Sequence, residues 1–146
     1  MVFPLDSPDM STFKVVVYSD DATVRESVRK ALGRRLSSDL PENEVIEFAT
    51  ADALRLFIDT KKVGQKSTVD LFILDGEATP EGGMGLARQL KDEIFNCPPT
   101  LLIVAREQDA WLAGWSRADG VVTHPIDPFT LSKSVLSLIA SPSTSR

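Results

Sequence analysis

Acidic side chains follow two short apolar runs in this chain of 146 residues. Ser19, Asp20 and Asp21 follow the first run, and the second run ends directly at Asp75. If the two runs form neighbouring strands of a parallel sheet, their carboxylates lie together at its carboxyl edge. Clustered carboxylates resist joint ionisation and favour a hard divalent cation such as Mg²⁺. The spacing therefore predicts an acidic, cation-binding site at that edge.

A simpler role is open to the first acidic pair, because aspartate is a common N-cap and a helical pattern follows Asp21. Asp75 is harder to explain in this way. A single acid that closes an apolar run needs a solvated or liganded place. Asp75 is therefore the stronger candidate for chemistry.

Five apolar runs alternate with amphipathic segments, and this alternation indicates the fold that positions the acids. The runs cover residues 14–18, 44–49, 70–75, 100–104 and 120–122. Apolar side chains between the runs recur every four residues, as in helices, and the last helix begins with Asp127 as N-cap and Pro128 as first residue. The pattern predicts a doubly wound α/β fold, in which helices cover both faces of a five-stranded parallel sheet.

Composition and charge restrict the class of protein. Hydrophobic residues make up 42% and charged residues 25%, which is typical of a globular domain. The net charge of 16 − 21 = −5 gives no electrostatic reason to bind nucleic acid or anionic membranes. Cys97 is the only cysteine, which excludes an internal disulfide and a multi-cysteine zinc site. Neither a secretory signal nor a membrane-length apolar stretch is present, so we expect a soluble cytoplasmic protein.

The two ends of the chain lack the periodic patterns of the middle. Residues 1–12 contain two prolines, and residues 141–146 are small and polar. We expect both to be flexible tails around a single domain at residues 13–140.

Four segments of the chain resemble the CheY-like receiver domain of bacterial response regulators, in the family's order and at close to its spacing. They read KVVVYSDDATVRESVRKAL, VDLFILDGEATPEGGMGLARQL, TLLIVAREQD and GVVTHPIDPFTL. The resemblance covers nearly all of residues 13–140 and implies the flavodoxin-like, CheY-like version of the predicted fold. It also implies a signalling module of a two-component phosphorelay rather than an enzyme.

The resemblance assigns roles to the acidic residues. In such receivers an aspartate at the end of the third strand takes a phosphoryl group from a sensor kinase's phosphohistidine, and Asp75 matches that position. An acid pair after the first strand helps to hold Mg²⁺, and here that pair falls on Ser19 and Asp20. Asp20 is therefore the first choice of metal ligand beside Asp75, and Asp21 is the second choice. The main-chain carbonyl of Glu77 is a further implied ligand.

Other family positions are altered in this chain. The fourth strand ends in Val104 where receivers carry Ser or Thr, and the fifth ends in His124 where they carry Lys. Val121 replaces the usual aromatic switch residue, and the loop after Asp75 is about two residues longer than usual. We therefore expect phosphorylation of Asp75 and binding of Mg²⁺ to be weak or absent. For His124, a role in the pocket and an ordinary strand-end position both stay open.

The function that follows is an atypical single-domain response regulator, which acts through protein–protein interaction. Its partner is a sensor histidine kinase, a downstream effector or a second copy of the chain. Trp111 and Trp115 share one helix face and form the candidate partner surface, with packing in the core as the alternative. The resemblance places that helix on a surface that it shares with the fifth strand and the fifth helix.

Two other functions stay open. A slow but genuine Mg²⁺-dependent phosphoacceptor is the first, because Asp75 and Asp20 are retained. A phosphatase of the haloacid dehalogenase type is the remote second, because residues 75–79 read DGEAT, a loose match to its D-x-D-x-T motif.

Overall fold

The computed structural model describes residues 12–62, 69–79, 81–94, 97–106, 109 and 111–140. Strands and helices alternate along these residues. The strands are β1 (Phe13–Tyr18), β2 (Asn43–Phe48), β3 (Leu71–Asp75), β4 (Thr100–Val104) and β5 (Gly120–Thr123). The helices are α1 (Ala22–Leu32), α2 (Ala51–Lys62), α3 (Gly83–Glu93), α4 (Trp111–Ser116) and α5 (Pro128–Ala140). The predicted alternation is confirmed, and the strand ends differ from the predicted ones by at most one residue.

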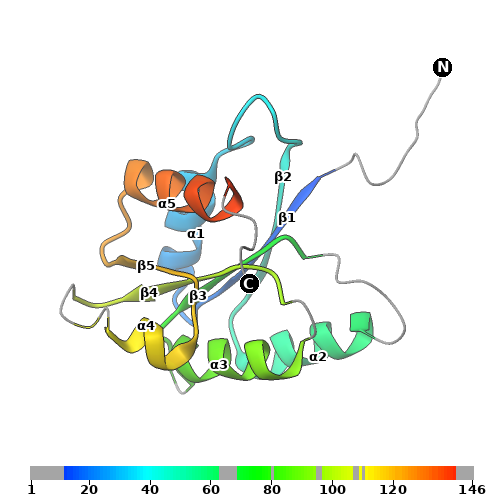
Figure 1. The fold of residues 1–146 in the computed structure, drawn as a ribbon, viewed down its shortest axis with the longest axis vertical. Helices are drawn as coiled ribbons and strands as arrows, with labels where there is room; N and C mark the ends of the chain where they lie inside the picture. The colour runs from blue at the N-terminus through cyan, green and yellow to red at the C-terminus, as the bar shows by residue number, and fades with distance from the viewer. Residues whose placement is uncertain are drawn as a thin grey trace.

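All strand pairs are parallel, and the strand order is β2-β1-β3-β4-β5. Helices α1 and α5 cover one face of the sheet, and α2, α3 and α4 cover the other (Figure 1). The predicted doubly wound α/β fold is therefore confirmed. Because β1 and β3 are neighbours, the residues that follow them meet at the carboxyl edge of the sheet.

Burial on both faces explains why the central strands are apolar on successive residues. Val15 and Val17 pack in the core cluster that includes residues of α1 and α5, whereas Val16 and Tyr18 pack in the cluster that includes residues of α2 and α3. A side chain of β1 is buried whichever way it points, as is usual for a parallel sheet covered by helices. The sheet and its two helical layers therefore form a rigid support for the strand ends.

Aspartate caps fix the start of two helices. The Asp21 carboxylate accepts a hydrogen bond from the Thr23 main-chain N–H at 2.8 Å, and α1 begins at Ala22. Asp127 accepts from the Thr130 N–H at 2.8 Å at the start of α5, as its predicted N-cap role requires. The hydrogen bonds from Thr130 lower the pKa of the Asp127 carboxyl, because they stabilise its ionised form.

The predicted tails lie almost wholly outside the described residues, so their flexibility stays a prediction. Thr12 is the exception, and its hydroxyl donates to the Glu44 carboxylate at 2.9 Å. In the part of the chain that the structure describes, every helix is too short or too polar to cross a bilayer.

Two leucines of α2 offer a matched test of this packing. Leu54 is fully buried, whereas Leu56 is 66% exposed. We expect Leu54→Ala to lower the free energy of unfolding by about 2–5 kcal/mol, because it leaves a cavity in the core. Leu56→Ala should change it by no more than about 0.5 kcal/mol. Urea denaturation followed by circular dichroism measures both, and equal losses would contradict the placement of α2.

Candidate functional site

Asp75 is the last residue of β3, and its side chain is only 4% exposed. The buried hydroxyl of Ser19, directly after β1, donates to Asp75 Oδ2 at 2.7 Å. The first residue of helix α3, Gly83, lies against the main chain of Asp75. A Cβ on Gly83 would be 2.7 Å from the Asp75 carbonyl oxygen. Only glycine allows that approach. The predicted convergence of the β1 and β3 ends is therefore present, and it brings a hydroxyl to the buried carboxylate.

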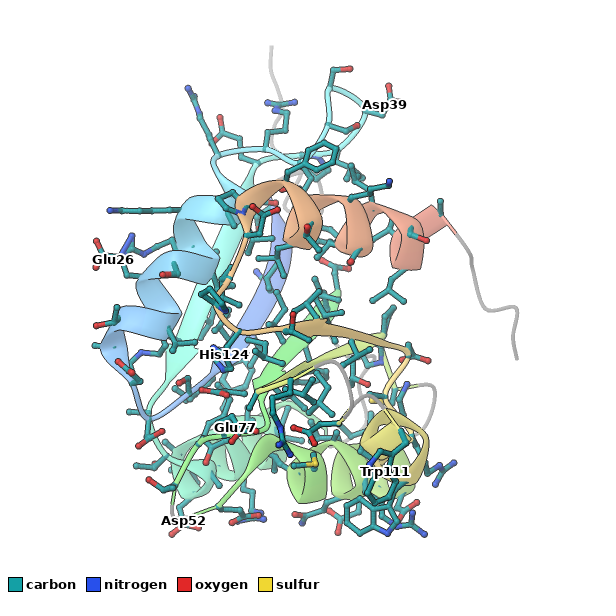
Figure 2. All side chains as sticks on the ribbon, turned by 90° about the vertical axis from the view of Figure 1, so that its left-hand side faces the viewer. Glu26, Asp39, Asp52, Glu77, Trp111 and His124 are labelled. Atoms are coloured by element: carbon teal, nitrogen blue, oxygen red, sulfur yellow. The ribbon has the colours of Figure 1, made fainter. Side chains whose placement is uncertain are left out.

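The second oxygen of the carboxylate, Asp75 Oδ1, contacts two further groups. The Glu77 N–H donates to it at 2.9 Å, and His124 Nε2 lies 3.1 Å from it. An ionised carboxylate can only accept hydrogen bonds, so this contact is a hydrogen bond when Nε2 carries the ring proton. Figure 2 shows the labelled side chains of His124 and Glu77 on the same side of the molecule. His124 thus contacts the carboxylate of the pocket, and a functional role for it stays a prediction.

Asp20 and Asp21 have different surroundings although they are adjacent. The exposed Asp20 accepts a hydrogen bond from the Thr79 hydroxyl at 3.1 Å, which links it to the loop after β3. Asp21 points its carboxylate at the first turn of α1 as the N-cap. Of the two, Asp20 is the one whose side chain contacts the loop that follows Asp75.

The pocket holds few acidic side chains that could bind a metal ion. Among the residues that the structure describes, no group of three or more His, Cys, Asp or Glu side chains could hold a metal ion. Mg²⁺ usually keeps several waters and needs only one or two protein carboxylates. Ser19 stands in the place of one acid, and hydroxyls already donate to Asp75 and to Asp20. A cation would compete with those hydroxyls for the carboxylate oxygens.

Apolar side chains occupy two of the altered positions. Val104 is the last residue of β4 and follows Ile103, the residue that pairs with Asp75 in the sheet. Its side chain is fully buried and has no hydrogen-bond donor. Val121 of β5 packs against the same core cluster as Val104. The main-chain N–H of His124 donates to the Val104 carbonyl at 2.8 Å, and this bond holds the ends of β4 and β5 together. The side chain at the end of β4 is therefore apolar and cannot donate a hydrogen bond to a ligand in the pocket.

The loop after Asp75 is fixed at Glu81, a feature that sequence reasoning missed. Arg55 of α2 makes a two-pronged ion pair with the Glu81 carboxylate and also donates to Gln89 of α3 at 2.7 Å. The buried Tyr18 hydroxyl donates to the Glu81 carbonyl. Hydrogen bonding to Glu81 raises the pKa of Arg55, and burial raises the pKa of Tyr18. These residues are far apart in sequence, so no local pattern points to the anchor.

Trp111 and Trp115 lie on the surface, so the core alternative is wrong for both. They are 70% and 50% exposed. Arg88 of α3 lies over the Trp115 ring, 5.3 Å from its centre, and donates to the Trp115 carbonyl at 2.6 Å. Trp115 therefore faces α3, which is not part of the surface that the resemblance implied.

No protein-family model matches this chain. Two curated proteins from two strains of Mycobacterium tuberculosis, each named an uncharacterized response regulatory protein, are 49% identical over 136 residues. That match covers 92% of this chain and 98% of each relative.

Solved structures with the same fold are more distant in sequence. A two-component response regulator of the LuxR family from Aurantimonas sp. SI85-9A1 is 24% identical, with a TM-score of 0.68 over 90% of this chain and 87% of its own. A CheY-like receiver domain protein from Methanospirillum hungatei JF-1 is 16% identical, with a TM-score of 0.64 over 90% and 96%.

The hydrogen bond between Ser19 and Asp75 can be tested by its effect on stability. Ser19→Ala leaves a buried carboxylate oxygen without this donor, so we expect the free energy of unfolding to fall by about 1–3 kcal/mol. The half-buried Ser27 of α1 is the matched control, and Ser27→Ala should change it by at most about 0.5 kcal/mol. Denaturant unfolding measures both variants. A loss for Ser19→Ala no larger than that of the control would show that the contact contributes nothing.

Proposed function

The chain belongs to the response regulator family and has its CheY-like receiver fold, and we propose that it is an atypical receiver that signals through protein–protein interaction, with weak or no phosphorylation at Asp75. One observation carries the proposal. Both oxygens of the Asp75 carboxylate are already hydrogen-bonded within the chain, while Val104 provides no donor for a phosphoryl oxygen.

The chemistry of phosphoryl transfer explains why these contacts matter. The nucleophile would be a lone pair on an Asp75 oxygen, and the hydrogen bonds to both oxygens stabilise the carboxylate charge and so lower its nucleophilicity. A donor aimed at the charge that develops in a transition state contributes about 10²–10³ in rate. Without a hydroxyl at Val104 that contribution is missing. His124, held against Asp75, reaches less far than a lysine.

Receiver domains typically bind Mg²⁺ at the phosphorylation site, and in general they are signalling domains rather than enzymes. For this chain we propose that Mg²⁺ binding is weak or absent and that no step depends on it. Asp20, Asp75 and the Glu77 carbonyl are the ligands that the resemblance implies, and a cation would compete with the hydroxyl groups that already donate to both carboxylates.

A slow Mg²⁺-dependent phosphoacceptor is the second candidate. Asp75 and Asp20 follow neighbouring strands, which is the observation that favours it. The haloacid dehalogenase hypothesis has no support left, because membership of the response regulator family accounts for Asp75 at the end of β3.

The proposed partner is a protein, either a sensor histidine kinase or a downstream effector, and a homodimer is the further candidate. The chain's net charge of −5 does not favour nucleic acid. We place the protein in the cytoplasm, where two-component response regulators receive their signals. A surface contact through the exposed tryptophans would carry the signal onward.

The state of Asp75 can be tested directly. We expect the purified protein, incubated with Mg²⁺ and acetyl phosphate, to show a phosphoryl adduct close to background in its intact mass, because hydrogen bonds lower the nucleophilicity of both carboxylate oxygens. Asp75→Asn supplies the background. An adduct on most molecules that needs both Mg²⁺ and Asp75 would instead establish the slow phosphoacceptor.

Restoring the two missing groups should recover phosphorylation. We expect Val104→Thr combined with His124→Lys to raise the adduct at least about tenfold, since it adds a hydroxyl donor and a fixed positive charge. Val104→Ala combined with His124→Lys is the control, because it lacks the hydroxyl. Intact mass after the same incubation is the measurement. An unchanged yield in the Thr and Lys variant would mean that other features limit the reaction.

A further inference from the structure

Two exposed tryptophans and one arginine form a contiguous surface between α3 and α4, here called the α3–α4 surface (Trp111, Trp115 and Arg88). Among the large apolar side chains that the structure describes, only Leu56 and Phe129 are comparably exposed, and they lie on other helices. Figure 2 shows Trp111 at the outer edge of α4, away from His124 and Glu77. The surface is therefore separate from the Asp75 pocket.

Arg88 fixes the geometry of this surface. Its guanidinium stacks over the Trp115 ring and also donates to the Trp115 main chain, so one side chain from α3 holds both the ring and the helix that carries it. A ring held in this way loses less conformational freedom when a partner covers it. The surface is thus preorganised for binding.

The polar groups of the α3–α4 surface are all donors. Indole N–H and guanidinium groups donate and cannot accept. Within the described residues, neither indole N–H has a hydrogen-bond partner and no carboxylate pairs with Arg88. Nearby cations are compensated, as Lys91 is by Asp119 and Arg117 by Asp92. The positive charge of Arg88 is thus left for a ligand that accepts hydrogen bonds.

We propose that the α3–α4 surface binds an acidic, partly apolar peptide segment of a partner protein. Carboxylates of the segment accept hydrogen bonds from Arg88 and the indole N–H groups, and apolar side chains cover the rings. The inference rests on the proposed protein-binding function and names the chemistry of the partner.

The size and charge of the surface favour a short segment over other occupants. A fully covered tryptophan buries about 150–250 Å², whereas one side of a standard protein interface needs about 800 Å². Two partly exposed rings therefore suit a peptide better than a second folded copy. Nucleic acid requires several cations along its phosphates, and among the described residues of this surface Arg88 is the one cation without a carboxylate partner.

Selection from a phage-displayed library of random linear peptides on the immobilised full chain tests the proposal. We expect the selected peptides to combine Asp or Glu with Leu or aromatic residues. Fluorescence polarisation should show that they bind Trp115→Ala and Arg88→Glu at least about tenfold more weakly than the unaltered chain. Leu56→Ala is the matched control on α2 and should bind equally. Thermal unfolding of each variant confirms that the fold is retained.

Three outcomes would overturn the inference. They are selection of no peptide, selection of peptides without acidic residues, and equal binding to the α3–α4 variants and the unaltered chain. Self-association that is lost in Trp115→Ala, seen by sedimentation, would assign the surface to a second copy instead. Asp75→Asn separates the two proposals. Peptide binding that this variant retains supports the inference whatever the phosphorylation result, and an absent adduct at Asp75 supports the proposed function even if no peptide binds.

Discussion

A carboxylate buried at the end of an apolar strand is the constraint around which this molecule is organised. Removing such a charge from water is costly unless hydrogen bonds replace the lost solvent. Asp75 meets that requirement with a hydroxyl from the end of β1, a main-chain N–H of its own loop and an imidazole from the end of β5. The parallel register must therefore bring three strand ends within hydrogen-bonding distance. Gly83, the first residue of α3, lies so close to the main chain of Asp75 that a Cβ there would clash with it.

The altered pocket and the exposed tryptophans are joined by one rigid element. Helix α3 begins at Gly83, against the Asp75 main chain, and carries Arg88, which holds Trp115. Val104 and Val121 pack in the same core cluster as three buried residues of this helix, Leu86, Ala87 and Leu90. A receiver of this kind can thus keep a defined binding surface without a chemical signal at Asp75.

Most of the scaffold could be predicted from sequence, because it depends on patterns that are local. Successive apolar residues indicated strands covered on both faces, and the cap at Asp127 followed from residue type and position. For the first helix, residue type left Asp20 and Asp21 both open, and the structure shows that Asp21 is the cap. Placement of Asp75 at a strand end followed in the same way. The contacts of the pocket could not be predicted from sequence. The hydrogen bonds of Ser19 to Asp75 and of Thr79 to Asp20 depend on how segments far apart in the chain align. The exposure of Trp111 and Trp115 was equally out of reach, since a spacing of four residues suits a buried and an exposed helix face alike.

The anchor at Glu81 changes how the longer loop after β3 contributes to the free energy of folding. Arg55 and Tyr18 bind Glu81, and Thr79 binds Asp20. These contacts divide the loop between β3 and α3 into shorter segments, each fixed at its ends. The entropy of closing a flexible loop grows only with the logarithm of its length, by about 0.6 kcal/mol for each doubling. Extra residues between Asp75 and Glu81 therefore add little to the closure entropy. This stretch can lengthen or shorten over evolutionary time while the strand ends and α3 keep their positions.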